Sequence, residues 1–337
     1  MIHAYAALKP GDPLQPYAYD PGELGDHQVE IDVAYCGICH SDISMIDNAW
    51  GMSEYPIVPG HEVAGYIAKV GKKVTHFKVG DRVGLGWHAG YCNHCEYCED
   101  GDANLCQQAQ PTIVKHHGGF ANKVRADWNS VVLIPKDIEL EYVGPFFCGG
   151  ITVFNPLIQY NIQPKDRVAV IGIGGLGHMA LAFLNQLGCE VTAMTSSPEK
   201  HQEALDLGAH HTLDSTNHRD MEAHQHEFDL IISTVNVKLD WNLFLSTLKP
   251  KGRLHFVGAT LEPLDVSVFA LIAAQRQISG SPVGSPKNIA LMLDFIQAHH
   301  IKPAIEIFEM KDVNTAIQKL RDGQIRYRAV LKNTALE

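Results

Sequence analysis

The amino-acid sequence predicts an α/β protein that combines a doubly wound parallel-sheet domain with a second, mainly β, barrel-like domain. Two patterns support this fold class: short apolar runs broken by glycine and proline up to about residue 148, and alternating strand and helix patterns over about 149–285. The length of 337 residues agrees, because a single hydrophobic core stops growing at roughly 250–300 residues. We therefore expect residues 1–148 and 286–337 to form one domain and residues 149–285 to form the other.

The first part of the chain has the sequence pattern of β-strands. Its strand-like segments are VEIDVAYCG (29–37), VAGYIAKVG (63–71) and DRVGLGW (81–87). Valine and isoleucine are frequent in them, and glycine-containing turns separate them. An all-β, barrel-like domain suits many short strands of this kind.

The middle of the chain alternates between strand and helix. It begins with RVAVIGI (167–173), a continuous apolar run typical of a buried parallel strand, followed by GLGHMALAFLNQLG (175–188), which has helical apolar spacing. The later segments repeat this order: EVTAMT (190–195), PEKHQEALDLG (198–208), FDLIIST (228–234), DWNLFLSTL (240–248) and GRLHFVGA (252–259). Such alternation is typical of a nucleotide-binding domain with helices on both faces of its sheet.

The tail after residue 286 has its own elements. NIALMLDFIQAHH (288–300) and VNTAIQKLRDG (313–323) have helical patterns, and RYRAVLKN (326–333) has the pattern of a final strand. We expect this tail to return and complete the first domain.

The overall composition excludes some classes of protein. The formal net charge is −11, whereas a broad nucleic-acid surface needs clustered lysine and arginine. No run of about 18 uncharged apolar residues is present, so no membrane span is expected. The N-terminal segment lacks the basic head and long apolar core of a secretory signal, and we expect a cytoplasmic protein.

Four of the eight cysteines are clustered in one loop. Their spacing, Cys92-x2-Cys95-x2-Cys98-x7-Cys106, allows four thiolates to close a tetrahedral coordination sphere. Such a closed sphere is structural, because it leaves no position for a substrate. Two disulfides, which the expected compartment disfavours, and an iron–sulfur cluster are the alternatives.

A glycine-rich loop follows the strand at 167–173. It fits the pattern G-x-G-x-x-G and comprises Gly172, Gly174, Gly175, Leu176 and Gly177. The pattern alone is weak, but here it lies between a predicted strand and a predicted helix. That context predicts a pyrophosphate site on the helix N-terminus. A tight turn without a ligand is the alternative.

The end of the next strand indicates which dinucleotide is bound. An NAD site usually has aspartate or glutamate there, whereas this chain has no acid at 194–197. Thr195, Ser196, Ser197 and nearby Lys200 instead suit a 2′-phosphate, and we predict NADP(H). Ser197 as a helix N-cap is the alternative, although one residue can serve both roles.

Three further segments contain candidate metal ligands: CGICHSD (36–42), GHE (60–62) and FCGG (147–150). Each is uninformative alone, because buried cysteines and His-Glu pairs are common. Two cysteines and one histidine would make a three-ligand zinc site with an open fourth position, as catalysis requires. Spacing cannot bring together ligands so far apart in the chain.

Taken together, these segments resemble the zinc-containing medium-chain alcohol dehydrogenases, in particular their cinnamyl alcohol dehydrogenase branch. The resemblance rests on CGICHSD, VPGHE (58–62), the four-cysteine loop, GIGGLG, the serine-rich strand end and the closing RYR (326–328), in that order. It covers nearly the whole chain. It implies a Rossmann domain and a GroES-like catalytic domain, two zinc ions per chain and NADP(H).

The resemblance also implies roles for individual residues. Cys39, His61 and Cys148 would bind the catalytic zinc, with Glu62 close to the metal or an alternative ligand. Asp42 would orient His61 through its other ring nitrogen. The implied reaction interconverts primary alcohols and aldehydes.

The resemblance implies a proton relay and a cofactor contact as well. Ser41 would accept the alcohol proton, and Thr152 would support the nicotinamide. Many relatives have histidine three residues beyond this serine, where this chain has Ser44. We therefore predict a functional but more pH-sensitive relay. His40 is adjacent to Ser41 but should point elsewhere, because we expect this segment to be extended.

Trp50 and Trp87 match aromatic positions of the substrate channel in relatives. This would favour aromatic or medium-length apolar substrates, although core packing is as good an explanation of each.

Two other functions are consistent with parts of the sequence. One is an NAD-dependent polyol or secondary-alcohol dehydrogenase of the same superfamily, and the other is a catalytically silent cofactor-binding protein. The resemblance also implies a homodimer, with QISGSPVG (277–284) as the edge strand that joins the subunits.

Overall fold

The computed structural model describes residues 1–334, which divide into two compact units: residues 1–151 with 283–334, and residues 152–282. The boundaries expected from the sequence lie three residues from these junctions. Within residues 1–334, no helix is both long and apolar enough to cross a bilayer.

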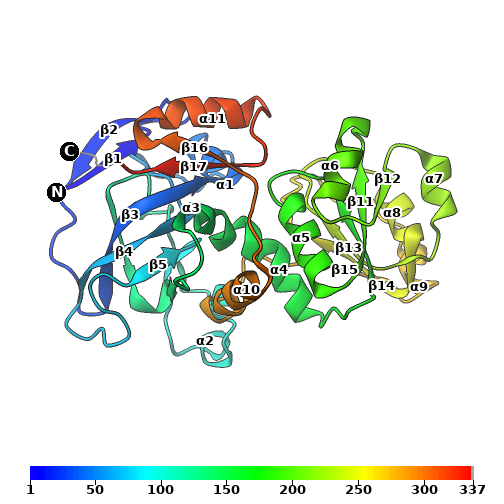
Figure 1. Cartoon of the computed structure of the whole chain (residues 1–337), viewed down its shortest axis with the longest axis horizontal. Helices are drawn as coiled ribbons and strands as arrows, with labels where there is room; N and C mark the ends of the chain where they lie inside the picture. The colour runs from blue at the N-terminus through cyan, green and yellow to red at the C-terminus, as the bar shows by residue number, and fades with distance from the viewer. Residues whose placement is uncertain (335–337) are drawn as a thin grey trace. The chain divides into compact units, whose positions relative to one another are not determined.

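The first unit is built on a seven-stranded sheet. Its main path runs β16-β17-β3-β4-β5-β9, and β8 pairs with β3 (Figure 1). The strands of the unit are β1 (Ile2–Ala6), β2 (Gln15–Tyr19), β3 (Gln28–Ile38), β4 (Val63–Val70), β5 (Arg82–Leu85), β6 (His88–Gly90), β7 (Gln110–Pro111), β8 (Lys123–Asp127), β9 (Val131–Leu133), β16 (Ile305–Glu309) and β17 (Arg328–Lys332). The helices are α1 (His40–Ile46), α2 (Glu96–Asp100), α3 (Leu140–Val143), α10 (Pro286–His299) and α11 (Val313–Arg321).

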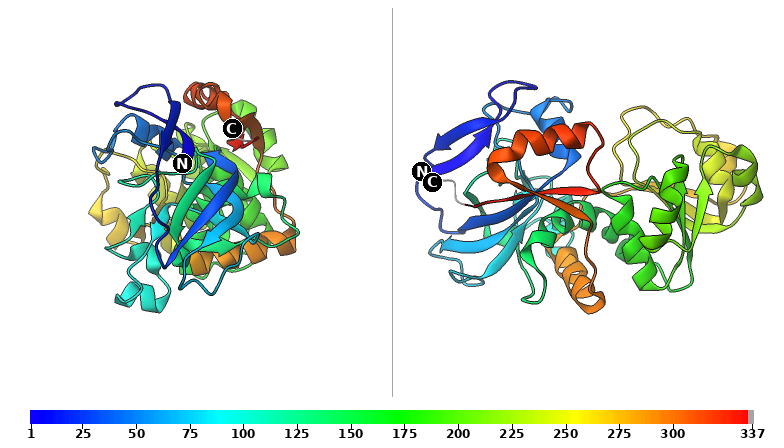
Figure 2. Two further views of the ribbon diagram at one scale, coloured as in Figure 1. Left: turned by 90° about the vertical axis from the view of Figure 1, so that its left-hand side faces the viewer. Right: turned by 45° about the horizontal axis from the view of Figure 1, so that its top comes forward.

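The core of this unit comes from the apolar runs seen in the sequence. Val29 and Ile31 of β3 and Val83 of β5 are fully buried. The tail returns as expected, because β17 pairs antiparallel with β3. In Figure 2 the red and orange segments from the end of the chain lie beside blue strands from its beginning. Asn314 of α11 also exchanges two hydrogen bonds with the backbone of Leu14, each 2.8 Å long.

The second unit is a parallel sheet of six strands in the order β12-β11-β10-β13-β14-β15. Its strands are β10 (Arg167–Ile171), β11 (Glu190–Thr195), β12 (His211–Asp214), β13 (Phe228–Ser233), β14 (Leu248–Phe256) and β15 (Gln277–Gly280). Its helices are α5 (Gly177–Leu187), α6 (His201–Asp206), α7 (His218–Ala223), α8 (Trp241–Thr247) and α9 (Val268–Ile272). Helices α5 and α6 lie on one side of the sheet, and α8 and α9 lie on the other (Figure 1). This is the doubly wound fold that the sequence predicts.

Glycine conformation explains two element ends in this unit. The strand predicted over 167–173 stops at Ile171, because Gly172 has a φ of 85° and turns the chain out of the sheet. Helix α5 ends at Leu187, and the φ of 88° at the following Gly188 suits only glycine well. Helix α4 (Gly149–Gln159) runs across the first junction between the units in the sequence.

Candidate active site and metal centres

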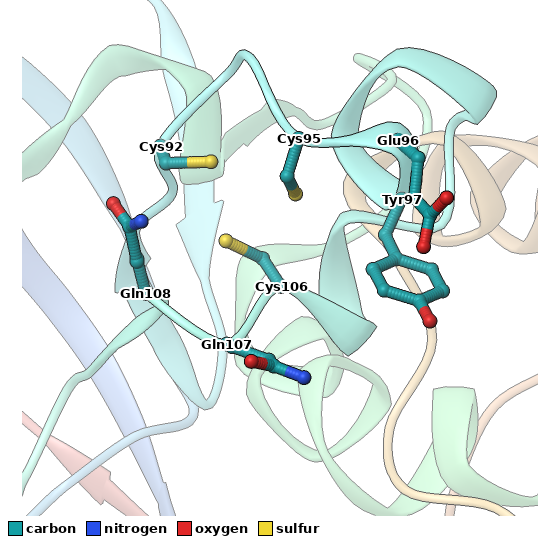
Figure 3. Close-up of a pocket in the computed structure, with 7 residues that line it drawn as sticks. All are labelled: Cys92, Cys95, Glu96, Tyr97, Cys106, Gln107 and Gln108. Carbon is teal, nitrogen blue, oxygen red and sulfur yellow. The ribbon is translucent and has the colours of Figure 1, made fainter.

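The four-cysteine loop brings its sulfur atoms together. The ligand atoms of Cys92, Cys95, Cys98 and Cys106 all lie within 4.8 Å of one another. Cys92 Sγ and Cys98 Sγ are 3.9 Å apart, and two thiolates on one tetrahedral zinc lie about 3.8 Å apart because the Zn–S bond is about 2.3 Å. Figure 3 shows the side chains of Cys92, Cys95 and Cys106 directed toward one another. The loop therefore fits a structural zinc ion with four thiolate ligands.

A second cluster is assembled from distant parts of the first unit. Cys39 precedes α1, His61 and Glu62 precede β4, and Cys148 precedes α4. Their ligand atoms lie within 4.8 Å of one another, and all four residues are buried. Cys39 Sγ and Cys148 Sγ are 3.8 Å apart, again the separation that tetrahedral zinc needs.

Two features of this cluster suit a cation. A hydrogen bond from Cys148 lowers the pKa of the Cys39 thiol well below its usual value, and His61 and Arg328 also favour the thiolate despite burial. His61 Nε2 is buried without a hydrogen-bond partner, while Nδ1 of the same ring lies 2.9 Å from Asp42 Oδ1. The unpaired nitrogen is thus available as a metal ligand.

Asp42 connects three parts of the cluster. Its Oδ1 accepts a 2.8 Å hydrogen bond from Gly60 N as well as contacting His61, and its Oδ2 accepts a 2.9 Å bond from Cys39 N. A single buried carboxylate therefore fixes the backbone of one cysteine and the ring of the histidine. Ser41 lies beside this group, with its Oγ 3.7 Å from Cys39 Sγ.

Arg328 is a residue of this site to which the sequence analysis assigned no role. It donates a hydrogen bond from Nη2 to Glu62 Oε1, and a second of 3.3 Å to the carbonyl of Ile38. Burial raises the pKa of Glu62 to about 7, although the positive charge of Arg328 opposes the rise. Glu62 Oε2 is buried without a hydrogen-bond partner. Glu62 is thus held beside the ligands with one oxygen available. The RYR segment contains Arg328, but two arginines flank Tyr327, and nothing local distinguishes them.

The two tryptophans lie close to the ligand cluster. The rings of Trp87 and His61 are 5.0 Å apart and nearly perpendicular, and Trp50 meets Trp87 edge to face at 6.0 Å. Both side chains are partly buried against the core of the unit. Trp87 therefore combines packing with a position next to a zinc ligand.

The conformation around His40 differs from the sequence prediction. His40 is the first residue of helix α1 and is exposed, so its segment is not extended. The capping box of Cys39 and Asp42 starts the helix at this position. Ser44 lies on the same helix and is partly buried.

The glycine loop of the second unit has room for a ligand. Gly172 needs its positive φ, and a Cβ on Gly177 would collide with the carbonyl oxygen of Gly172. A Cβ on Gly174, in contrast, would meet no atom within 4 Å. Packing within the chain therefore does not require glycine at 174, whereas close approach of a pyrophosphate does. Gly175 and Leu176 complete the turn before α5.

The end of β11 presents hydroxyl groups and a cation. Thr195 is buried and its Oγ1 accepts a 3.2 Å hydrogen bond from Ser197 N, while Ser196 is exposed. Ser197 stands at the N-cap position of a short helix, but its side chain makes no capping hydrogen bond. Lys200 Nζ donates a 3.2 Å bond to the carbonyl of Ile173 in the glycine loop. Thr152, in α4, is 8% exposed.

Known proteins share this fold. Residues 25–136 match the family described as alcohol dehydrogenase GroES-like domain, and residues 175–298 match zinc-binding dehydrogenase. The chain is 57% identical over 334 residues to aldehyde reductase AdhA of Synechocystis sp., covering 99% of both proteins. The chain belongs to the zinc-containing medium-chain alcohol dehydrogenases.

Two solved structures place the enzyme within this family. A cinnamyl alcohol dehydrogenase of Sorghum bicolor superposes with a TM-score of 0.94 at 38% identity, with 98% of this chain and 97% of that chain covered. A cinnamyl alcohol dehydrogenase of Helicobacter pylori, solved with NADP(H), superposes with a TM-score of 0.89 at 33% identity and the same coverage. These likenesses confirm the predicted cinnamyl alcohol dehydrogenase-like branch.

The family and the geometry together confirm three predictions. The fold class is confirmed, the chain is a zinc-dependent oxidoreductase, and it has one catalytic and one structural zinc site. The catalytic ligands are Cys39, His61 and Cys148, and the structural ligands are the four loop cysteines. A catalytically silent protein would have no need of the buried trio with its open position.

Proposed function

We propose that this enzyme is an NADP(H)-dependent aldehyde reductase and alcohol dehydrogenase that acts on primary, aromatic or medium-chain substrates. The preference for NADP(H) is inferred from the residues at the end of β11. They offer hydroxyl groups and Lys200 but no acid that would repel a 2′-phosphate. The similar H. pylori enzyme was solved with NADP(H). The 57% identity to the aldehyde reductase of Synechocystis supports the proposed class of reaction.

Different residues of the chain have different roles in the reaction. When bound, zinc supplies a Lewis acid for the substrate oxygen, and NADPH supplies the hydride. Cys39, His61 and Cys148 hold the metal, and Asp42 keeps the His61 ring in one orientation. Ser41 exchanges the hydroxyl proton of the substrate, because its Oγ lies next to the ligand sulfur of Cys39.

Glu62 and Thr152 have supporting roles in this proposal. Glu62 stays beside the metal ligands through its pair with Arg328, and its second carboxylate oxygen would be available as an alternative ligand when no substrate is bound. Thr152 supports the nicotinamide end of the cofactor. Gly172, Gly174, Gly175, Leu176 and Gly177 receive the pyrophosphate at the N-terminus of α5.

The tryptophans supply the substrate preference. Trp87 lies edge to face with His61, so a substrate oxygen near the ligand cluster brings its carbon chain close to the indole rings of Trp87 and Trp50. Aromatic and apolar chains gain contact area there, whereas a polyol leaves its hydroxyl groups without partners.

We also propose a cytoplasmic homodimer. Eight free cysteines, six of them zinc ligands by our assignment, suit a compartment that keeps thiols reduced. β15 is an edge strand of its sheet, and the nearby segment exposes Leu261, Val268, Phe269 and Ile272, with exposed fractions between 66% and 77%. An edge strand next to exposed apolar side chains is a typical site of subunit contact.

The proposal is tested with the purified zinc-loaded enzyme. Cinnamaldehyde and benzaldehyde are offered with NADPH or NADH, and consumption of the cofactor is followed by its absorbance before and after zinc chelation. We expect NADPH to be used much faster than NADH and chelation to abolish turnover. Equal or faster use of NADH would contradict the cofactor assignment and leave the zinc chemistry intact. Turnover of polyols or secondary alcohols alone would contradict the substrate assignment.

A further inference from the structure

The chain passes between its two units twice, and the two connections differ in kind. The first lies inside helix α4, whose regular hydrogen bonds restrain it. The second is the return segment, residues 281–285, which lies between β15 and α10 and has no regular structure. Contacts outside regular secondary structure must therefore supply whatever restraint the return segment has.

We propose that Asn104 is a positioning residue through which the structural-zinc loop holds the return segment, and that this contact contributes to cofactor affinity. Asn104 lies in a 3-10 helix (Ala103–Leu105) directly before the zinc ligand Cys106. Its Nδ2 donates a 2.9 Å hydrogen bond to the carbonyl of Val283, in the middle of the return segment. This contact spans 179 positions of sequence, so no local pattern predicts it.

A second contact brings the same loop against the residues that follow. Gly101 ends α2 with a φ of 90°, and a Cβ placed on it would lie 3.0 Å from Lys287 Cδ. The backbone of the loop therefore abuts the first turn of α10. Both contacts come from the part of the loop between Cys98 and Cys106, whose conformation is set by the ligands on either side.

The two ends of the return segment are held in other ways. Ser281 Oγ lies 2.9 Å from His255 Nε2, and Ser281 N donates a 3.3 Å hydrogen bond to the carbonyl of Phe256. At the other end Ser285 is fully buried and caps α10 by accepting a bond from Asn288 N. Between these anchors, Asn104 restrains the residues that neither a strand nor a helix fixes.

The physical consequence concerns the free enzyme. Zinc binding orders a loop of this kind, and the ordered loop holds the Asn104 side chain in place. If the contact is lost, the return segment samples more conformations, and cofactor binding then has to order it again. A looser connection therefore weakens cofactor binding, because part of the binding free energy is spent on ordering it. The identity of this cofactor rests on the proposed function.

Asn129, in a 3-10 helix (Trp128–Ser130), provides a matched control that contacts the same loop from outside it. Its Nδ2 donates a 3.2 Å hydrogen bond to the carbonyl of Tyr91, directly before Cys92, and its Oδ1, like that of Asn104, is buried without a partner. Asn129 thus anchors the opposite end of the loop, through Tyr91 and Asn93. Asn104→Ala, the nearly isosteric Asn104→Asp and Asn129→Ala are compared with the wild type as zinc-loaded enzymes.

Three measurements separate the possibilities: the zinc content, the Kd for NADPH by fluorescence titration, and hydrogen–deuterium exchange of peptides covering 281–289. We expect two zinc ions per chain in every variant. Both Asn104 variants should bind NADPH roughly 3- to 10-fold more weakly, the range that one lost hydrogen bond produces, with faster exchange in 281–289. The kcat at saturating cofactor should change less than about 2-fold. Asn129→Ala should leave the Kd and this exchange unchanged.

An unchanged Kd in both Asn104 variants would overturn the proposal, as would an equal loss of affinity in Asn129→Ala. A loss of zinc in the Asn104 variants would also overturn it, since Asn104 would then act on the metal site. A wild-type enzyme that prefers NADH would contradict the proposed cofactor instead. In that case the Kd comparison is made with NADH, and the exchange and zinc measurements keep their meaning.

Discussion

Arg328 donates a hydrogen bond to Glu62 in an ion pair whose side chains are only 6% and 0% exposed. The pair lies beside Cys39 and Cys148, which are thiolates when they bind zinc. Arg328 therefore offsets part of the negative charge that Glu62 and the two sulfurs gather in a buried space. Its position follows from the sheet, because β17 pairs with β3 so that Ala329 faces Ile38.

Removal of one partner of this pair is expected to destabilise the enzyme strongly. Arg328→Met leaves the Glu62 carboxylate buried without its cation, which typically costs about 3–5 kcal/mol. The double variant Arg328→Met/Glu62→Gln removes both charges and should recover a large part of that loss. The free energy of unfolding of Arg328→Met, Glu62→Gln and the double variant is measured in denaturant, together with the zinc content. If the loss in the double variant equals the sum of the losses in the two single variants, the pair is not coupled.

The cofactor preference should respond to a charge at Ser197. In Ser197→Asp a carboxylate stands where we place the 2′-phosphate, and like charges at such a distance cost several kcal/mol. We expect kcat/KM for NADPH to fall about 100-fold while the value for NADH falls far less. Ser197→Asn has nearly the same shape without the charge and serves as the control. If both substitutions lower NADPH use equally, shape rather than charge determines the preference.

A histidine in place of Ser44 on α1 should make the proton relay less sensitive to pH. Ser44 is partly buried one helical turn beyond Ser41, and its hydroxyl does not titrate near neutral pH. In Ser44→His an imidazole with a pKa near 6.5 can pass the proton on, so alcohol oxidation should lose less activity as the pH falls from about 8 to 6. The pH profile of kcat checks this, with Ser44→Asn as the control. A profile identical to that of the wild type would mean that the relay does not pass through this position.

The sequence predicted those parts of the site that are local in the chain. The structural-zinc ligands lie within 15 residues, so their spacing alone indicated a closed site. The catalytic ligands are up to 109 positions apart, and only the family resemblance grouped them before the sheet was known. Arg328 was missed for the same reason, since its contact with Glu62 spans 266 positions. The conformation around His40 was predicted wrongly, because the capping interaction of Asp42 starts a helix in a segment that we expected to be extended.

The stability of the second unit should depend on the protonation of His255. Burial lowers the pKa of this fully buried ring to about 4, with a smaller effect of Arg253, whereas 6.5 is the value expected after unfolding. The unfolded chain therefore binds more protons between these pH values, so the contribution of neutral His255 is complete above pH 6.5 and is lost as the pH falls toward 4.

We expect this residue to remove up to roughly 1.4 kcal/mol of stability for each pH unit of that interval. His255→Gln keeps hydrogen-bonding groups for Ser279 and Ser281 but does not titrate. Unfolding in denaturant at several pH values from about 7 to 5 should show a shallower decline for the variant than for the wild type. The other histidines are present in both proteins and cancel in the difference. Parallel curves would show that His255 has the same proton affinity in the folded and unfolded chain.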